Sequence, residues 1–320
     1  MIKKLSMLFL QMFCMLLITS GHKVFGLPPQ MECTPEQTVS SIKAFLETNG
    51  YIMDTKTIGS GSFGKVFLAT DVHEKTVAIK CVANEKSSKY EFEIFQNQAI
   101  KSCENITQTI AKFVLPMPTQ NICILIMERN LGKTLADIWL DAEKKIDEKA
   151  MLIVLTHISN TLVTLQKAGY VHRDIKPDNI MFHDGKFRLI DFGFIIPIKE
   201  KNKPVSGYHP YIAPEILKYA MGQQPDYDEK IDIWSLGVMA YHLLSGHFPY
   251  EARNNDENPP LPLPYEQIIA NQKHFCKEIV PSIDYFNGIL KKCLTFDPQL
   301  RISAKKLFEE LSALSKESSS

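Results

Sequence analysis

Hydrophobic and polar residues alternate in strand-like fashion over residues 51–82, and helical spacing dominates beyond Leu131. The stretches KVFLAT and TVAIKCV alternate as strands do, and DVHEK between them predicts the turn of a hairpin. Further on, AKFVLPMPTQNICILIME predicts two more strands around a turn that contains proline. Beyond Leu131, KAMLIVLTHISNTLVTLQKAG and DIWSLGVMAYHLLSG repeat apolar residues at helical intervals and end at glycine. A strand-rich part followed by a helix-rich part predicts two lobes.

Two further helices are predicted in the strand-rich part. TPEQTVSSIKAFLETNG begins with Thr34 before Pro35 and Glu36, which is typical of a helix start, and Gly50 is a typical stop. This helix would lie in an N-terminal extension, residues 27–50. SSKYEFEIFQNQAIKS also fits a helix. At the other end, SKESSS predicts a disordered tail over residues 315–320.

Length and composition describe an ordinary globular protein. The 320 residues exceed the roughly 100 to 200 expected of one domain, which favours two lobes or one large domain. Hydrophobic residues make up 45% and charged residues 22%, which argues against general disorder. Lys+Arg and Asp+Glu both number 36, so net charge gives no sign of a nucleic-acid partner, and none is expected.

Residues 1–26 have the pattern of a secretory signal peptide. Lys3 and Lys4 precede an uncharged, mostly apolar run from Leu5 to Gly21, and cleavage fits near Gly21 or after Gly26. An uncleaved anchor is the alternative, although the run is shorter than the roughly 20 residues that a span needs. Both interpretations direct the chain into the secretory pathway or out of the cell. Only the uncleaved form would be attached to a membrane.

Cysteines and glycosylation sequons bear on the compartment. The only sequon, NIT at Asn105, is weak evidence because such triplets arise by chance. Of seven cysteines, Cys14 lies in the predicted signal, and the others show neither disulfide-type nor metal-type spacing. We expect these to be reduced, largely buried thiols, which favours an effector delivered into the cytosol of another cell over a lumenal protein. They are Cys33, Cys81, Cys103, Cys123, Cys276 and Cys293.

The stretch GSGSFG, residues 59–64, is a complete G-x-G-x-x-G. A dinucleotide-binding fold uses the same spacing between a strand and a helix. Here the glycines lie between two strand patterns, which favours a hairpin whose backbone can close over phosphates. The next strand pattern contains VAIK, and Lys80 within an apolar run needs a reason such as a buried anionic partner.

The stretch YVHRDIKPDNIMF places three polar groups of catalytic type on one loop. Asp174, Asn179 and the later Asp191 could converge, with one carboxylate orienting a hydroxyl and the other two groups holding Mg²⁺. Lys176 would add positive charge where phosphoryl oxygens pass.

In their order along the chain, these motifs resemble those of a eukaryotic-type protein kinase over residues 51–314. The set comprises GSGSFGKV, VAIK, HRDIKPDN, DFG, APE, DIWSLG and the arginine of DPQLRIS. The resemblance implies an α+β, two-lobed fold. A small β-rich N-lobe with one helix would span 51–128, and the hinge and a larger, mainly helical C-lobe would span 129–314.

The resemblance also implies roles for single residues. Lys80 would hold the α- and β-phosphates of ATP and pair with a glutamate on the following helix, for which Glu91 fits better than Glu93. Asp174 would be the catalytic base, and Lys176 would contact the γ-phosphate.

The nucleotide and its metal would be held by a larger set. Asn179 and Asp191 would be the Mg²⁺ ligands. ATP would contact Gly59, Ser60, Gly61, Ser62, Phe63, Gly64, Val66, Ala78, Lys80, Met127 and Glu128.

Other positions are expected to serve the structure or specificity. His172 and Phe192 fit packing roles, and Glu215 with Arg301 resembles a buried ion pair of the family. HRDIKPDN has Lys two residues after the Asp, which resembles serine/threonine kinases. Phe194 favours serine over threonine as the residue that is phosphorylated.

The segment after DFG departs from the family. Tyr208 stands where serine/threonine kinases usually have Thr, and Pro204 stands where many relatives carry a phosphorylated Thr. Arg173 keeps the basic partner of such a phosphate. We hypothesise that activity is independent of phosphorylation in this segment, where Ser206 is the only nearby alternative.

The leading hypothesis is an active, monomeric serine/threonine kinase that uses Mg-ATP on a protein substrate whose identity the sequence leaves open. A secreted, nucleotide-binding pseudokinase acting as an interaction module is the alternative, and the presence of Lys80, Asp174, Asn179 and Asp191 argues against it. An adhesion module without nucleotide is a third interpretation, which the phosphate-binding motifs oppose.

Overall fold

The computed structural model describes residues 35–61, 64–82, 89–118, 120–143, 146–200, 209–223, 227–254, 261–278 and 286–317. These residues form two compact units. The first contains residues 35–82 and 111–126, and the second contains 89–110 and 127–317. The predicted signal peptide, residues 1–26, and Thr34 lie outside the described residues.

A five-stranded sheet forms the first unit, in the order β1-β2-β3-β5-β4. The hairpin predicted from KVFLAT and TVAIKCV is confirmed, with Phe67 opposite Ile79 and Val66 opposite Lys80. The two strands predicted around the proline-bearing turn are confirmed as β4 and β5. The strands are β1 (Tyr51–Gly61), β2 (Gly64–Asp71), β3 (Thr76–Val82), β4 (Thr109–Leu115) and β5 (Ile122–Glu128).

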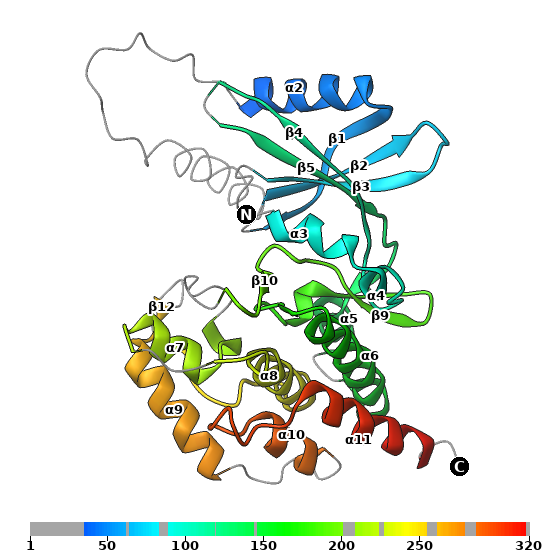
Figure 1. The fold of residues 1–320 in the computed structure, drawn as a ribbon. Helices are drawn as coiled ribbons and strands as arrows, with labels where there is room; N and C mark the ends of the chain where they lie inside the picture. The colour runs from blue at the N-terminus through cyan, green and yellow to red at the C-terminus, as the bar shows by residue number, and fades with distance from the viewer. Residues whose placement is uncertain are drawn as a thin grey trace, which may run out of the picture. The chain divides into compact units, whose positions relative to one another are not determined.

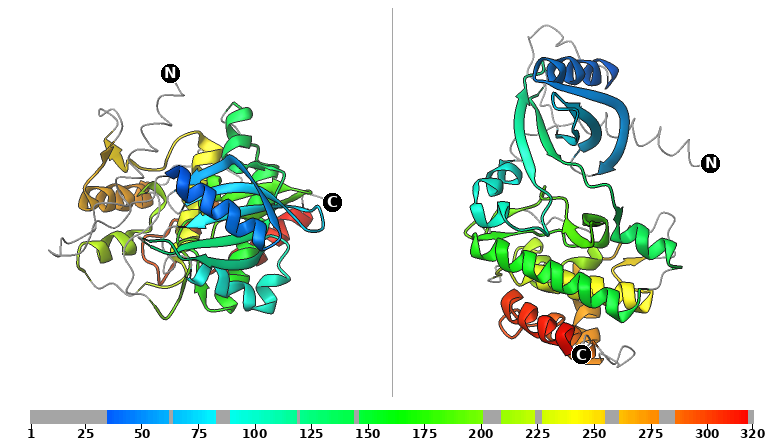
Figure 2. Two further views of the ribbon diagram at one scale, coloured as in Figure 1. Left: turned by 90° about the horizontal axis from the view of Figure 1, so that it is seen from above. Right: turned by 90° about the vertical axis from the view of Figure 1, so that its right-hand side faces the viewer.

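Helix α2 (Pro35–Thr48) covers one face of this sheet, as Figures 1 and 2 show. Its Ile42 and Leu46 are buried in one cluster with Met53, Phe67, Ala69, Val77, Ile79, Cys81, Ile122, Ile124 and Ile126. On β3, these core positions alternate with Ala78, Lys80 and Val82, which therefore lie on the opposite face. The helix predicted in the extension is thus confirmed and is an integral part of the unit. It ends before Gly50, whose φ of 83° is one that glycine adopts readily.

Helices dominate the second unit (Figure 1). Its core forms around α6 and α8, which bury residues such as Leu155, Leu162, Trp234 and Leu236. Both predicted long helices are confirmed, and α8 ends at Gly246, which has a φ of 83°. The α-helices are α3 (Lys89–Glu93), α4 (Gln98–Lys101), α5 (Leu135–Asp141), α6 (Glu148–Lys167), α7 (Pro214–Ala220), α8 (Ile231–Ser245), α9 (Tyr265–Glu278), α10 (Asn287–Cys293) and α11 (Ala304–Glu317).

Short strands and 3₁₀ turns connect these helices. They form a three-stranded sheet in the order β6-β8-β9 and the two-stranded pairs β10-β7 and β11-β12. The strands are β6 (Lys133–Thr134), β7 (Tyr170–Val171), β8 (Ile180–His183), β9 (Lys186–Leu189), β10 (Ile196–Pro197), β11 (Arg253–Asn254) and β12 (Leu261–Pro262). The 3₁₀ turns are η1 (Ile94–Gln96), η2 (Pro177–Asn179) and η3 (His209–Tyr211).

The single helix predicted over SSKYEFEIFQNQAIKS was wrong in its continuity. The chain forms α3, then η1, then α4, with Asn97 extended at φ −79° and ψ 123°. The Asn97 side chain accepts a hydrogen bond from the backbone N of Ala99, which starts a new helix at this point.

The two compact units divide the chain differently from the predicted N-lobe, residues 51–128. Ile94, Phe95 and Ile100 belong to the hydrophobic core of the second unit, so α3, η1 and α4 are part of that unit. At the C-terminus, α11 continues through Glu317. The prediction of disorder from residue 315 was therefore wrong for residues 315–317.

The surroundings of Asn105 and of the cysteines bear on glycosylation and on redox state. Asn105 of the sequon is 8% exposed, and its Nδ2 donates to the carbonyl of Phe187 at 3.0 Å, so this side chain is inaccessible to a glycan in the folded protein. The five cysteines in the described part are thiols outside disulfides and are buried or half-buried, as expected: Cys81, Cys103, Cys123, Cys276 and Cys293. Burial raises the pKa of Cys81 to about 12 and that of Cys276 to about 11, which keeps them as unreactive thiols. Within the described residues, no helix is both long and apolar enough to cross a membrane.

The packing of α2 predicts that it stabilises the first unit. Leu46 has no exposed surface, so Leu46→Ala should lower the free energy of unfolding by about 2–5 kcal/mol through lost burial and a cavity. Chemical denaturation would measure this. Leu140→Ala on α5 is the matched control, because Leu140 is 56% exposed and its loss should cost below about 0.5 kcal/mol. Equal effects of the two substitutions would contradict a structural role for α2.

Candidate active site

The loop HRDIKPDN connects two strands of the second unit. It leaves β7 at Val171 and passes through η2, and β8 begins immediately after Asn179. Pro177 is the first residue of the 3₁₀ turn, where its fixed φ and missing N–H are tolerated. The polar groups of YVHRDIKPDNIMF therefore lie on one loop, as predicted.

Two of the predicted groups, Lys176 and Asn179, converge on the carboxylate of a third, Asp174. Lys176 Nζ lies 2.8 Å from Oδ2 of Asp174, and Asn179 Nδ2 lies 2.7 Å from the same oxygen. Asn179 Nδ2 also donates to the backbone carbonyl of Asp174 at 2.8 Å. The Asp174 side chain is 5% exposed and that of Lys176 23%. These contacts fix the position of a buried carboxylate and place a cation next to it.

Asp191 is brought next to this group by the β8-β9 pair. Ile180 lies opposite Leu189, and the backbone N of Ile190 donates to the carbonyl of Asn179 at 3.0 Å. Oδ1 of Asp191 accepts from the backbone N of Gly193 at 2.9 Å, which orients the carboxylate. Asn179 and Asp191 therefore lie on neighbouring backbone segments.

The donor set of Asn179 and Asp191 fits Mg²⁺. Because both bonds of the Asn179 amide are made by Nδ2, the side-chain carbonyl oxygen remains for a metal. Within the described residues, no cluster of three or more His, Cys, Asp or Glu side chains could hold a metal ion. One carboxylate and one amide oxygen are hard ligands of the kind to which phosphate oxygens and water are added around Mg²⁺.

Asp232 fixes the backbone that leads to Asp174. Its Oδ2 accepts from the backbone N of His172 and its Oδ1 from that of Arg173, both at 2.8 Å. Arg173 has a φ of 74°, a left-handed conformation unusual for a residue with a side chain. Burial raises the pKa of Asp232, and the two N–H donors oppose this rise. The sequence showed Asp232 only as part of DIWSLG and did not indicate this role.

His172 and Phe192 have packing roles, as expected. The His172 ring lies 5.3 Å from that of Phe192, which in turn lies 5.5 Å from that of Phe95. His172 has no exposed surface, and its Nε2 has no hydrogen-bond partner among the described residues. Its Nδ1 faces the backbone N of Asp174 at 3.2 Å. A ring so enclosed accepts a hydrogen bond from the backbone of Asp174 and so helps to orient this residue.

The residues predicted to contact adenine and phosphates share one face of the five-stranded sheet. Val66 pairs with Lys80 and Leu68 with Ala78, and these positions alternate with those that pack under α2. Met127 on β5 also falls on this face, because Ile124 and Ile126 belong to the α2 side. Lys80 is 5% exposed although it is a cation in an apolar strand.

The glycine-rich stretch forms the end of the β1-β2 hairpin. Gly59 pairs with Val66, Ser60 with Lys65 and Gly61 with Gly64. Gly64 has a φ of 142°, and a Cβ there would lie 1.9 Å from the carbonyl oxygen of Cys81. Glycine is therefore required at this position by the approach of β2 to β3. Ser62 and Phe63, at the predicted phosphate contact, lie outside the described residues.

Between the two candidate glutamates, burial favours Glu91. Glu91 is 2% exposed on α3, whereas Glu93 is exposed. The predicted hinge begins with Glu128, whose backbone N donates to the carbonyl of Gln108 at 2.9 Å. Oε2 of Glu128 accepts from the backbone N of Gln108 at 3.3 Å, so the end of β5 is held by the start of β4.

The segment before APE is held by three buried side chains that the sequence did not reveal. Tyr250 donates to the carbonyl of Pro210 at 2.7 Å. Ser235 donates to the carbonyl of Tyr211 and Gln272 to that of Ile212, both at 2.8 Å. Successive carbonyls are thus bonded by the loop after α8, by α8 itself and by α9. Tyr208, Ser206 and Pro204 lie outside the described residues.

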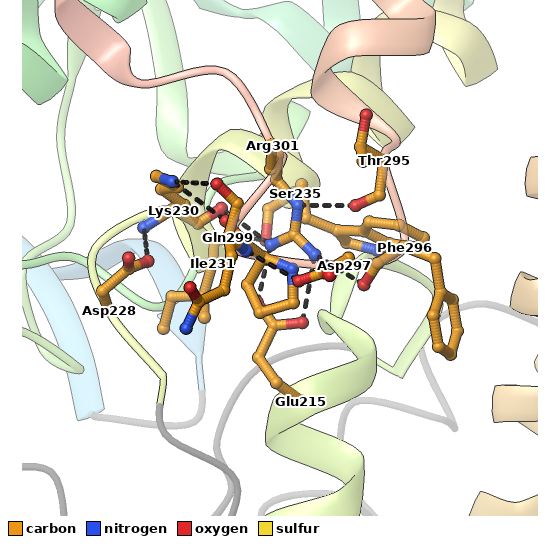
Figure 3. Close-up of polar contacts among 12 residues, drawn as sticks. Glu215, Asp228, Lys230, Ile231, Ser235, Thr295, Phe296, Asp297, Gln299 and Arg301 are labelled. Carbon is orange, nitrogen blue, oxygen red and sulfur yellow. Dashed lines mark hydrogen bonds and ion pairs between the residues drawn. The ribbon is translucent and has the colours of Figure 1, made fainter.

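Glu215 of α7 and Arg301 form the buried pair that was predicted. The guanidinium donates to the two carboxylate oxygens at 2.6 and 3.0 Å, and neither side chain is more than 3% exposed (Figure 3). Arg301 also donates to the carbonyls of Thr295 and Lys230 at 3.0 and 3.1 Å, and its guanidinium carbon lies 5.0 Å from the ring centroid of Trp234. The pair therefore joins α7, α8 and the segment before α11.

Comparison with known proteins agrees with this geometry. The family model described as the protein kinase domain matches residues 52–311. The chain belongs to the protein kinase domain family. Its α+β architecture, with a β-sheet unit and a helical unit, is that of the kinase domain, so the predicted fold class is confirmed.

Curated relatives are serine/threonine-protein kinases by name. The chain is 34% identical to CST20 of Candida albicans over 212 residues, covering 64% of this chain and 16% of the relative. It is 31% identical to max-2 of Caenorhabditis elegans, covering 79% of this chain and 38% of the relative. It is 30% identical to STE20 of Candida glabrata, covering 80% and 27% respectively. The chain thus spans well under half the length of these kinases.

Removal of Arg301 from this kinase domain should be strongly destabilising. Arg301→Met leaves the Glu215 carboxylate buried without its partner, which should cost about 3–5 kcal/mol in thermal or chemical unfolding. The double variant Glu215→Gln/Arg301→Met should regain part of this loss. Lys133→Met provides the control, because Lys133 and Asp141 form an exposed pair at 2.7 Å and its loss should cost below about 1 kcal/mol. Similar losses for Arg301→Met and Lys133→Met would contradict the importance of burial.

Proposed function

We propose that the chain is an active serine/threonine protein kinase that transfers the γ-phosphate of ATP, with Mg²⁺, to a protein hydroxyl. The convergence of Lys176 and Asn179 on the Asp174 carboxylate, with Asp191 on the adjacent segment, is the observation that carries this proposal. A loop that only connected two strands at the surface would not be expected to bury a carboxylate between a lysine and an asparagine side chain.

Each group has a defined part in the proposed reaction. The carboxylate of Asp174 orients the substrate hydroxyl and receives its proton. Lys176 places a positive charge beside this carboxylate, where negative charge develops on the transferred phosphoryl group. Asn179 and Asp191 would hold Mg²⁺, which supplies charge neutralisation when ATP is bound.

The nucleotide would be held by the sheet and the glycine-rich hairpin. Val66 and Ala78 offer an apolar surface to adenine, and Lys80 on the same face would meet the α- and β-phosphates. We propose Glu91 as the ion-pair partner of Lys80. Gly59 and Gly61 leave the hairpin backbone without side chains that would obstruct the phosphates.

Two observations favour catalysis over the pseudokinase alternative. Pseudokinases typically lack the lysine, the base or a metal ligand, whereas Lys80, Asp174, Asn179 and Asp191 are all present. The backbone before Asp174 is also held in the strained conformation of Arg173, and such strain is typical of functional sites. Serine/threonine specificity is supported by Lys176 and by the names of the relatives.

Substitution of the proposed base tests the enzyme directly. Asp174→Asn keeps the shape of the side chain but removes the proton acceptor, so transfer from γ-³²P-ATP to a generic protein substrate should fall at least about 100-fold. Asp184→Asn is the matched control, because Asp184 is exposed in the β8-β9 turn and should leave the rate unchanged. Phosphoamino-acid analysis should show phosphoserine or phosphothreonine. ATP binding without transfer by the wild-type chain would instead establish the pseudokinase.

The hypothesis of independence from activation-segment phosphorylation has a separate test. Ser206→Ala protein, made in a host without eukaryotic kinases, should transfer phosphate at a rate within about twofold of the wild-type rate, since no phosphate at this site is needed. Phosphatase treatment of the wild-type protein should also leave its rate unchanged. A large loss in either experiment would show that Ser206 phosphorylation is required.

A further inference from the structure

Helix α3 is tied to the segment after DFG by one side-chain hydrogen bond. The hydroxyl of Tyr90 donates to the carboxylate of Glu200, which is 110 residues further along the chain. Tyr90 is 8% exposed and precedes Glu91 directly. This contact therefore acts on the helix that carries the proposed partner of Lys80.

Glu200 is itself held in place by backbone bonds. Strand β10 pairs with β7, with Ile196 opposite Val171 and Pro197 opposite Tyr170. The backbone N of Ile198 donates to the carbonyl of Gly169 at 2.8 Å, and that of Glu200 donates to Pro197 at 2.9 Å. Since β7 leads directly into HRDIKPDN, these bonds connect the backbone of Glu200 to the strand that enters the catalytic loop.

Charged neighbours surround this hydrogen bond. Lys89 Nζ lies 4.9 Å from the centroid of the Tyr90 ring, and its pKa is raised chiefly by Tyr90, with smaller contributions from Glu93 and Glu200. The hydrogen bond to Glu200 raises the pKa of Tyr90, so the hydroxyl stays protonated as a donor. Burial raises the pKa of Tyr170, and the charge of Glu93 adds to this rise. Helix α3 therefore contacts the segment after DFG through the hydrogen bond from Tyr90 to Glu200, with charged side chains of α3 nearby.

Helix α3 depends on such contacts for its position. It has five residues, which is far below the length at which an isolated helix is stable, and Asn97 separates it from α4. Phe95 packs on Phe192 in the following turn. The bond from Tyr90 to Glu200 is a second, polar attachment near the start of the helix.

We propose that Tyr90 and Glu200 are positioning residues that hold α3, and with it Glu91, in the orientation that phosphoryl transfer requires. This inference rests on the proposed kinase function. Glu200 places a negative charge on the segment after DFG, where it accepts the bond from Tyr90. In a kinase without such a carboxylate, a phosphate on this segment would have to supply the charge.

Kinetics of Tyr90→Phe test this proposal. The variant keeps the ring and loses the donor, so kcat for transfer to a generic protein substrate should fall about five- to tenfold, as expected for a partly exposed hydrogen bond to a carboxylate. Tyr241→Phe is the matched control. The Tyr241 ring packs on His247 and Phe275, and its hydroxyl forms no hydrogen bond among the described residues, so kcat should not change. A wild-type kcat in Tyr90→Phe would overturn the proposal.

Variants at Glu200 establish whether the two residues act through each other. Glu200→Gln keeps an acceptor and should lose less kcat than Glu200→Ala. In the double variant Tyr90→Phe/Glu200→Ala, kcat should fall no further than in the more impaired single variant, because one bond is lost in each case. Losses that multiply would show that the residues act independently and would overturn the proposal.

Hydrogen exchange separates failure of this inference from failure of the kinase function. In full-length Tyr90→Phe, amides of residues 89–93 and 196–200 should exchange about five- to tenfold faster than in wild type, while Tyr241→Phe should leave them unchanged. Unchanged exchange in Tyr90→Phe would overturn the attachment even if the wild type is an active kinase. Faster exchange with an inactive wild type would support the attachment and reject the kinase function.

Discussion

The buried carboxylate of Asp232 is the constraint on which the candidate site depends. It lies on α8 in the middle of the second unit's core and accepts from the backbone N–H groups of His172 and Arg173. A buried carboxylate is costly unless it is bonded, so the loop must supply both donors. The same bonds stabilise the positive φ of Arg173 and set the direction in which the chain enters Asp174. A helix that is itself buried thus determines where the catalytic carboxylate lies.

A row of packed aromatic rings connects the loop that Asp232 holds to the turn after α3. His172 follows Val171, Phe192 packs on His172, and Phe95 packs on Phe192. Each contact is an edge-to-face arrangement, which aromatic rings favour and which leaves little room for rotation. Displacement of Phe192 would therefore disturb Asp191 on one side and the turn after α3 on the other. The hydrogen bond from Tyr90 to Glu200 restrains the position of α3 at a second place.

Local patterns predicted much of this arrangement and failed where contacts are distant in sequence. Alternation predicted the β2-β3 hairpin, and motif spacing predicted that Asp174, Lys176 and Asn179 share one loop, where Lys176 and Asn179 contact the Asp174 carboxylate. Alternation could not show that Tyr90 reaches Glu200, because nothing near either residue indicates the other. The break at Asn97 was missed because apolar spacing continues through it, while its cap competes locally with the helix. Buried donors such as Tyr250 and Gln272 were missed because their acceptors are backbone carbonyls, which leave no mark in the sequence.

The described parts of the segment between DFG and APE are held without a phosphate. Before residue 201, the β10-β7 pair and Glu200 fix the chain. After residue 208, the carbonyls of Pro210, Tyr211 and Ile212 each accept a bond from a buried side chain, and Glu215 is bound by Arg301. Arg173, the basic residue available to a phosphate, has Asp232 and Tyr227 as neighbours, which only partly offset the lowering of its pKa by burial. The expectation of activity without phosphorylation therefore rests on the described ends of the segment, which are bonded by the fold itself.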